Sequence, residues 1–214
     1  MPAGKLIRIR RRGKPSLSKK VNRLAKKVKA INLRAEKHFA DSSIALTEAD
    51  DNGIVSNITG PAQGDGSNHR TGLKIRAKSL GVHFTCRHQQ SDSILRLMIF
   101  MDRQQVDSTT PSVNDVLDSQ SYDEFLDVFD QAGRFKVLLD KTFVNHSGAG
   151  GTGTAQVPQY LKKYIKLDTT MMFSTTTSSS ISRNGLYALV ISDYDSTGNA
   201  AQYEARFRLS FYDS

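Results

Sequence analysis

Beyond the first forty residues, hydrophobic and polar positions alternate in several segments of the chain. In 203–213 the odd-numbered residues from Tyr203 to Phe211 are apolar, whereas the even-numbered residues from Glu204 to Arg208 are charged. The same alternation occurs in 80–88, with apolar residues at Leu80, Val82, Phe84 and Cys86. Because successive side chains of a strand point to opposite faces, each segment predicts a β-strand with one buried face.

Other segments with apolar runs or partial alternation predict further strands at 39–47, 94–103, 134–146, 160–173 and 185–194. They are separated by stretches rich in Gly, Ser, Thr, Asn and Asp, and one short helix is predicted at 111–119, "PSVNDVLDS". Seven or eight strands without long helices between them predict an all-β fold. An eight-stranded jelly-roll sandwich fits this number of strands.

The first part of the chain has a helical period instead. Apolar residues recur at steps of four and three, at Leu17, Val21, Leu24, Val28, Ile31 and Ala35. This spacing predicts an amphipathic helix over 16–36, with Ser16 or Ser18 as its N-cap. Residues 1–15 carry many charges and little apolar surface, so we expect them to be disordered when free. The apolar stripe of the helix is narrow, which suits a seam with other copies of the same helix.

The charge is distributed as unevenly as the periodicity. Fourteen of the first forty residues are Lys or Arg and only Glu36 is acidic, giving this segment a charge of +13 within a chain of net charge +9. The sequence therefore predicts two parts: a basic arm, 1–37, and a folded body of one domain, 38–214. So much positive charge in one segment requires a polyanionic partner, and nucleic acid is the obvious one.

The Lys and Arg residues of the arm are the candidate nucleic-acid-binding residues. We expect phosphate contacts from Arg8, Arg10, Arg11, Arg12, Lys14, Lys19, Lys20, Arg23, Lys26, Lys27 and Lys29. No Phe, Tyr or Trp precedes Phe39, so the arm has no ring on which a base could stack. Binding should therefore be strong, sensitive to salt and independent of sequence. The same basic runs also match a nuclear localisation signal, which would bind a nuclear import receptor.

The body offers no motif for catalysis or for a cofactor. The glycines of 148–153 match a dinucleotide-binding pattern by letter, but no amphipathic helix follows them. The five histidines show no metal-ligand spacing with the one cysteine, Cys86, and the acidic turn at 48–51 is not a calcium-loop motif. We therefore expect no metal, no cofactor and no enzymatic activity. No apolar run is long enough to span a membrane, and we expect a soluble protein made in a reducing compartment.

Several motifs in the middle of the chain resemble those of a known family. They are "RTG" (70–72), "MDRQ" (101–104), "TTPSVNDVL" (109–117) and "RFKVLLDK" (134–141), which occur in order within 52–145. In combination they resemble the coat proteins of the smallest icosahedral viruses. These comprise satellite tobacco necrosis virus with its relatives and the capsids of circular Rep-encoding single-stranded DNA viruses. The last motif is most similar to the DNA-virus capsids.

This resemblance implies an eight-stranded jelly roll, a homo-oligomeric T=1 shell of sixty copies, and an arm that points inward to a single-stranded genome, with DNA favoured. It places the protein in the virion and, during assembly, in the host nucleus. Family members can carry calcium at subunit contacts, and Asp65 falls where one carboxylate ligand would lie, but Lys74 stands near a position expected for a neutral ligand. The metal sites are therefore not transferred to this chain.

Two other classes of protein remain as alternatives. The first is a cellular nucleic-acid-binding protein with a basic tail on a β-sandwich, working as a monomer or dimer. The second is an enzyme on a jelly roll, which would need a cupin-like set of His and Glu ligands that no segment offers. Assembly into a shell distinguishes the coat protein from the first alternative.

Overall fold

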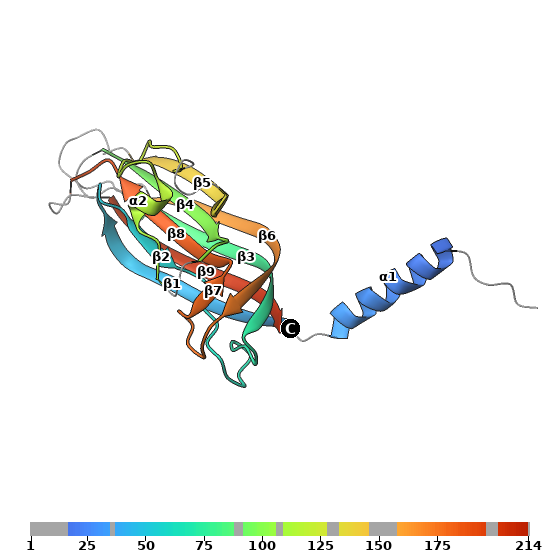
Figure 1. Ribbon diagram of the computed structural model, residues 1–214. Coiled ribbons are helices and arrows are strands. Elements are labelled where there is room, and N and C mark those ends of the chain that lie inside the picture. Colours follow the sequence, from blue (N-terminus) through green and yellow to red (C-terminus); the bar gives the residue numbers. More distant parts are fainter. Residues whose placement is uncertain are drawn as a thin grey trace, which may run out of the picture. The chain divides into compact units, whose positions relative to one another are not determined.

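The computed structural model describes residues 17–34, 37–87, 92–105, 109–127, 133–145, 158–195 and 201–213. The chain divides into two compact units, Met1–Glu36 and Lys37–Ser214. The first unit contains helix α1 (Leu17–Arg34). The second unit is built from two β-sheets (Figure 1).

One sheet has five strands in the order β1 (Lys37–Ala49), β9 (Ala201–Asp213), β3 (Lys74–Arg87), β6 (Gln159–Phe173) and β7 (Ile181–Arg183). The other has four strands in the order β2 (Ile54–Asn57), β8 (Gly185–Ser192), β4 (Ser93–Asp102) and β5 (Phe135–Asn145). All neighbouring strands are antiparallel.

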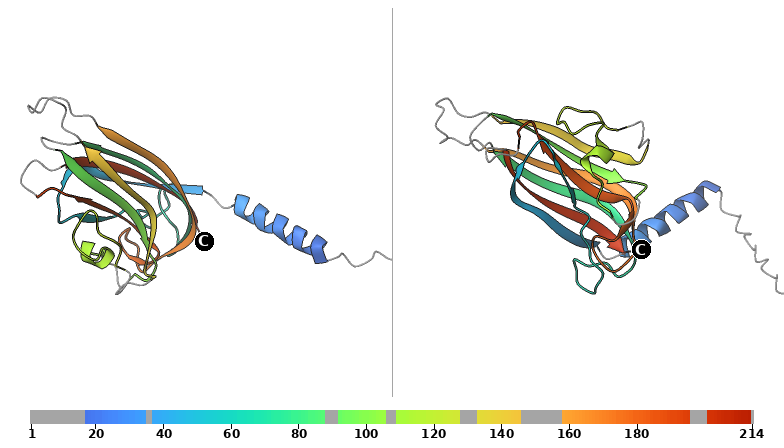
Figure 2. Two further views of the ribbon diagram at one scale, coloured as in Figure 1. Left: turned by 90° about the horizontal axis from the view of Figure 1, so that it is seen from above. Right: turned by 60° about the vertical axis from the view of Figure 1, so that its left-hand side comes forward.

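Apart from the three-residue strand β7, each sheet contributes four strands, and the chain crosses between the sheets at every step except from β4 to β5. The two sheets face each other in Figure 2. Eight antiparallel strands in two facing sheets with this connectivity form a jelly roll. The predicted all-β fold is confirmed.

The strands predicted from alternation differ from the observed ones at their ends by no more than two residues, except in β3. This strand begins at Lys74, six residues before the predicted segment. A β-bulge between Ala77 and Ser79 shifts the alternation, so Ile75 and Ala77 do not continue the pattern of Leu80 and Val82. Two short strands, β2 and β7, were not predicted, because three or four residues give too few positions for a period.

The main core lies between the two sheets. Alternate residues of β3 and β9, including Val82, Phe84 and Phe207, are buried there against Leu95 and Leu97 of β4. These inward-facing positions are the ones that the alternating pattern singled out, as burial between two sheets requires.

A second cluster covers the other face of the four-stranded sheet. All eight residues of β8 are buried. Tyr187 and Leu189 of β8 pack with Val113 and Val116 of helix α2 (Val113–Val116). Burial raises the pKa of the Tyr187 phenol to about 12, opposed by a hydrogen bond from Gln105. Helix α2 is shorter than the predicted 111–119 because Leu117 already has an extended backbone.

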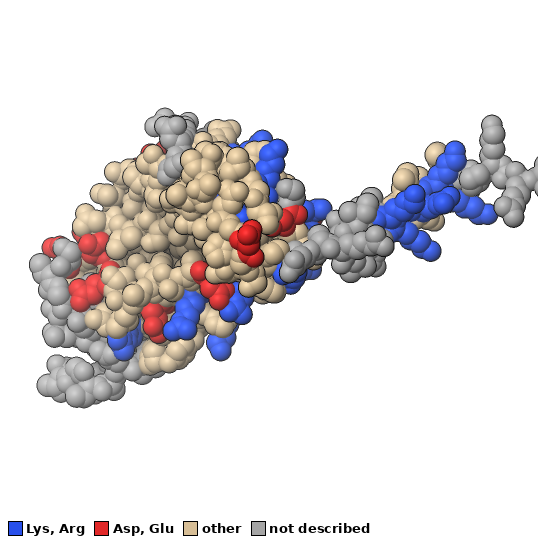
Figure 3. Space-filling model, turned by 90° about the horizontal axis from the view of Figure 1, so that it is seen from below, with Lys and Arg blue, Asp and Glu red and all other residues tan. Residues whose placement is uncertain are grey.

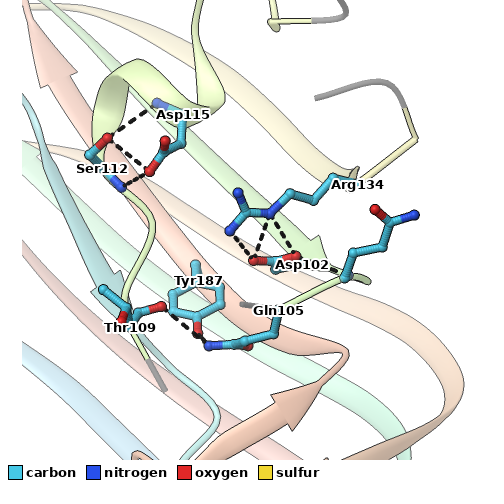
Figure 4. Close-up of polar contacts among 8 residues, drawn as sticks. Asp102, Gln105, Thr109, Ser112, Asp115, Arg134 and Tyr187 are labelled. Carbon is cyan, nitrogen blue, oxygen red and sulfur yellow. Dashed lines mark hydrogen bonds and ion pairs between the residues drawn. The ribbon is translucent and has the colours of Figure 1, made fainter. Parts of the chain in front are cut away.

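The motifs at 101–104, 109–117 and 134–141 meet at this cluster (Figure 4). The carboxylate of Asp102, which is fully buried, accepts a hydrogen bond from Arg134 Nη2 at 2.9 Å. Ser112 caps α2 by accepting from the backbone N–H of Asp115, whose carboxylate accepts from the backbone N–H of Ser112 in return. These motif residues therefore hold the α2 segment and the end of β4 in place.

Replacing Asp102 with Ala should destabilise the body strongly. Arg134 is only 14% exposed, so its guanidinium would lose its buried counter-charge. Removing one partner of such a pair costs about 3 kcal/mol or more. Urea unfolding of the full-length subunit, followed by circular dichroism, measures the change.

Asp41→Ala is the matched control, because Asp41 also forms a two-bonded pair with an arginine, Arg208, but both side chains are more than half exposed. We expect its unfolding midpoint to stay close to that of the unaltered chain. Equal midpoints for the two variants would contradict a structural role for the buried pair.

Candidate nucleic-acid interface

Helix α1 presents its basic residues away from its apolar stripe. At about 100° per residue, Leu17, Val21 and Leu24 fall within an arc of about 60°. The basic residues Lys19, Lys20, Arg23, Lys26 and Lys27 fall within a separate arc of about 120°. Eighteen residues make the helix about 27 Å long. Between Lys19 and Lys27 it can therefore present a row of cations about 12 Å long.

All side chains described for α1, from Leu17 to Lys27, are exposed. In the space-filling view, Lys and Arg cover much of the helix and no acidic side chain interrupts them (Figure 3). On the body in the same view, basic and acidic side chains lie interspersed. In this view the positive charge is therefore denser on α1 than on the body.

Of the eleven residues expected to contact phosphate, five lie exposed on α1: Lys19, Lys20, Arg23, Lys26 and Lys27. Lys29 belongs to the same helix, but its side chain is outside the described part of the structure. The other five, Arg8, Arg10, Arg11, Arg12 and Lys14, lie outside the described residues. Three other predictions also fall outside the described residues: the disorder of 1–15, the glycine-rich segment 148–153, and Ser16 as an N-cap. The other proposed N-cap, Ser18, lies within α1.

The described apolar residues of the α1 stripe lie exposed. Leu17, Val21 and Leu24 are each more than half exposed. Exposed apolar side chains in a single row are typical of a helix that associates with another apolar surface. The predicted seam between copies of this helix remains a prediction.

Several arginines of the body are bound within the fold and are unavailable to a ligand. Arg70, of the "RTG" motif, is fully buried, and its guanidinium lies 4.0 Å from the ring centroid of Phe173. The guanidinium donates to the backbone carbonyls of Pro61, Gly72, Thr175 and Thr177. Burial lowers the pKa of Arg70 from its usual value, and the nearby Asp213 opposes that shift. Arg70 therefore joins two loops at one end of the body.

Arg96 is bound in a similar way. Its Nη2 donates to Asp140 Oδ2 at 2.6 Å, and its Nη1 donates to the backbone carbonyls of Tyr122 and Glu124. The hydrogen bond to Asp140 raises the pKa of Arg96. Arg96 thus fixes the 122–124 segment to the four-stranded sheet.

No set of three or more His, Cys, Asp or Glu side chains converges as a metal site within the described ranges. Cys86 lies in the core, and burial raises the pKa of its thiol to about 12, opposed by a hydrogen bond to Asn145. Such a thiol is a poor nucleophile at neutral pH. Among the described helices, none combines the length and the apolar character needed to cross a membrane.

A jelly-roll body joined to a basic segment is typical of the coat proteins of small icosahedral viruses. The chain belongs to the satellite tobacco necrosis virus coat protein family, whose family model matches residues 9–213. The predicted resemblance to small icosahedral virus coat proteins is confirmed by this match. The protein is therefore a structural component of a virion.

Among solved structures, the chain is similar to one from Desmodium yellow mottle tymovirus, at 10% identity and a TM-score of 0.36, over 84% of this chain and 88% of that one. A second similar structure is that of the infectious bursal disease virus Gx strain, at 9% identity and a TM-score of 0.30. That match covers 83% of this chain but only 30% of the other. A comparison with curated protein sequences found no match.

Replacing Arg70 with Lys should destabilise the body without changing its affinity for nucleic acid. One ammonium group cannot reach all the carbonyls that the planar guanidinium binds, and unsatisfied buried carbonyls cost about 1–3 kcal/mol each. We expect a loss of about 3 kcal/mol in urea unfolding. The salt dependence of oligonucleotide binding should stay the same.

Arg183→Lys, at an exposed position of β7, serves as the control and should leave the unfolding midpoint unchanged. A variant Arg70→Lys with normal stability and weakened oligonucleotide binding would instead place Arg70 in the nucleic-acid interface.

Proposed function

We propose that this coat protein assembles into a T=1 shell of sixty copies and packages a single-stranded genome through its basic arm. The observation that carries the proposal is the exposed row of cations on α1, free of acidic side chains, in a member of a coat protein family. The described cations of this row neutralise phosphates in any sequence.

The charge of the arm matches this task in magnitude. Sixty arms of charge +13 carry about 780 positive charges, enough to neutralise a strand on the order of a thousand nucleotides together with other cations. DNA is the favoured genome because the segment 134–141 is most similar to the capsids of single-stranded DNA viruses.

The alternative is a cellular protein that binds nucleic acid as a monomer or dimer through the same arm. Membership of the coat protein family favours the capsid. The two functions differ in assembly, because only the capsid protects nucleic acid from nuclease inside a closed particle.

Electron microscopy of the purified protein, with the 260/280 nm absorbance ratio measured before and after nuclease treatment, tests packaging. We expect uniform particles of about 20 nm, the size that sixty bodies of this mass would form, with nuclease-protected nucleic acid. Deleting residues 1–29 should abolish packaging and leave the body folded, because the compact unit that holds both sheets begins at Lys37.

A second variant separates charge from chain length. Replacing Lys19, Lys20, Arg23, Lys26 and Lys27 with Gln keeps the helix propensity of α1 but removes five positive charges. It should package less nucleic acid, whereas the same positions carrying only Lys-to-Arg exchanges should package normally. A chain lacking 1–29 that still encapsidates nucleic acid would refute the role of the arm, and a small soluble species would favour the cellular alternative.

The arm also has the composition of a nuclear import signal, which suits a genome that is replicated in the host nucleus. Residues 1–37 fused to a fluorescent reporter should concentrate it in the nucleus through a nuclear import receptor. The reporter with the same segment carrying Gln at its basic positions should not accumulate there. Even distribution of both reporters would count against import by the arm.

A further inference from the structure

The five-stranded sheet carries a groove on the face turned away from the core. Its volume is about 780 Å³, which lies in the range of ligand-binding sites. The floor lies on the central strands β3 and β9, where Ser79, Gly81 and Ser210 have small side chains or none. Phe39 of β1 and Tyr164 of β6 lie on opposite sides of this floor.

The floor of this groove consists of residues with little or no side chain. Ser79 and Ser210 form a hydrogen bond with each other at 2.7 Å, so their hydroxyls need no further partner. A Cβ on Gly81 would meet only ordinary van der Waals contacts, the nearest at 3.8 Å to the carbonyl oxygen of Arg208. A Cβ would therefore fit at Gly81 and would occupy part of the hollow.

Three basic residues cross this face in a row. The strand register places Arg206 opposite His83, and His83 opposite Lys162. Arg206 and Lys162 therefore lie on the two strands that flank β3, one on each side of His83. Within the described residues, none of the three has an ion-pair partner.

Two carboxylates on the same face already form ion pairs with other Arg and Lys side chains. Asp41 binds Arg208 with two hydrogen bonds, and Asp168 binds both Arg76 and Lys78. These contacts hold the pKa of each carboxyl below its usual value. Glu204 also lines the groove, one outward position away from Arg206. The groove lining thus carries Lys37, Arg206 and Arg208 against Asp41 and Glu204, and Lys162 adds one more cation beside His83.

Exposed aromatic rings accompany these cations. Tyr164 is 63% exposed and Phe39 is 44% exposed, and Tyr160 lies on the same face of β6, beyond Lys162. A basic groove with aromatic side chains is the combination that binds single-stranded nucleic acid, because each base has a flat face that can stack. The groove thus supplies the stacking surface that the arm lacks.

We propose that this groove binds a segment of single-stranded nucleic acid, with a base stacked on Tyr164 and phosphates held by Arg206 and Lys162. The proposal rests on the proposed function, since it gives the packaged strand a second contact. Lys37, the first residue of β1, also lines the groove and is joined through the chain to the arm.

Two probes of equal charge separate the groove from the arm. A fifteen-nucleotide oligothymidylate and an abasic oligomer of the same length carry the same phosphates, so an arm that binds only phosphate cannot tell them apart. Fluorescence anisotropy with full-length subunits should show that the unaltered chain prefers the thymidylate by about tenfold, which corresponds to stacking of one base.

Tyr164→Ala should remove this preference and leave the affinity for the abasic oligomer unchanged, whereas Tyr164→Phe, which keeps the ring, should retain it. Gly81→Val should also remove the preference by filling the floor. Phe125→Ala is the control, because Phe125 is exposed in a loop outside this sheet and should have no effect.

If the unaltered chain bound the two probes with equal affinity, the proposed binding of a base in the groove would be wrong. If replacing the cations of α1 then abolished binding of both probes, the proposed function of the arm would still be supported. Binding of neither probe would overturn both. A preference that survives Tyr164→Ala and Gly81→Val would place stacking elsewhere and overturn the assignment. If Tyr164→Ala changed only the oligomeric state measured by sedimentation, the face would be a contact between copies. That result would also contradict the proposed nucleic-acid site.

Discussion

The burial of one face of each sheet against the other is the constraint on which the rest of the body depends. It fixes the inward positions of β3 and β9, and so determines which side chains face outward. The second cluster, between β8 and α2, adds a third layer on one side only. The four-stranded sheet is therefore covered in part on its outer face, whereas the five-stranded sheet presents the groove on its own outer face.

The cations of the chain fall into two groups, those bound within the body and those exposed on α1. Arg70, Arg96 and Arg134 each hold segments of the body together through carbonyls or a carboxylate. The described cations of α1, from Lys19 to Lys27, are exposed instead. A count of Lys and Arg along the sequence cannot separate these two groups, because only burial and hydrogen-bond partners distinguish a structural arginine from an available one.

The sequence predicts the long strands well because burial on one face leaves a period of two, as in β9. It predicts α1 for the equivalent reason at a helical period. It could not predict the pair of Asp102 and Arg134 or the groove, since these join positions far apart in the chain and depend on strand order. The exposed cations Lys162 and Arg206 looked like ordinary polar positions of alternating strands, and only their register brings them into one row with His83.

The β-bulge in β3 has a consequence for the whole outer face of its sheet. Ile75 and Ala77 before the bulge and Leu80 and Val82 after it are all buried, although one pair is odd-numbered and the other even-numbered. The additional residue, Lys78, thus changes the phase of the strand halfway along its length. A jelly roll with the same sequence but an unbroken phase would turn Gly81 and His83 inward. The composition of this surface is therefore set by a single inserted position.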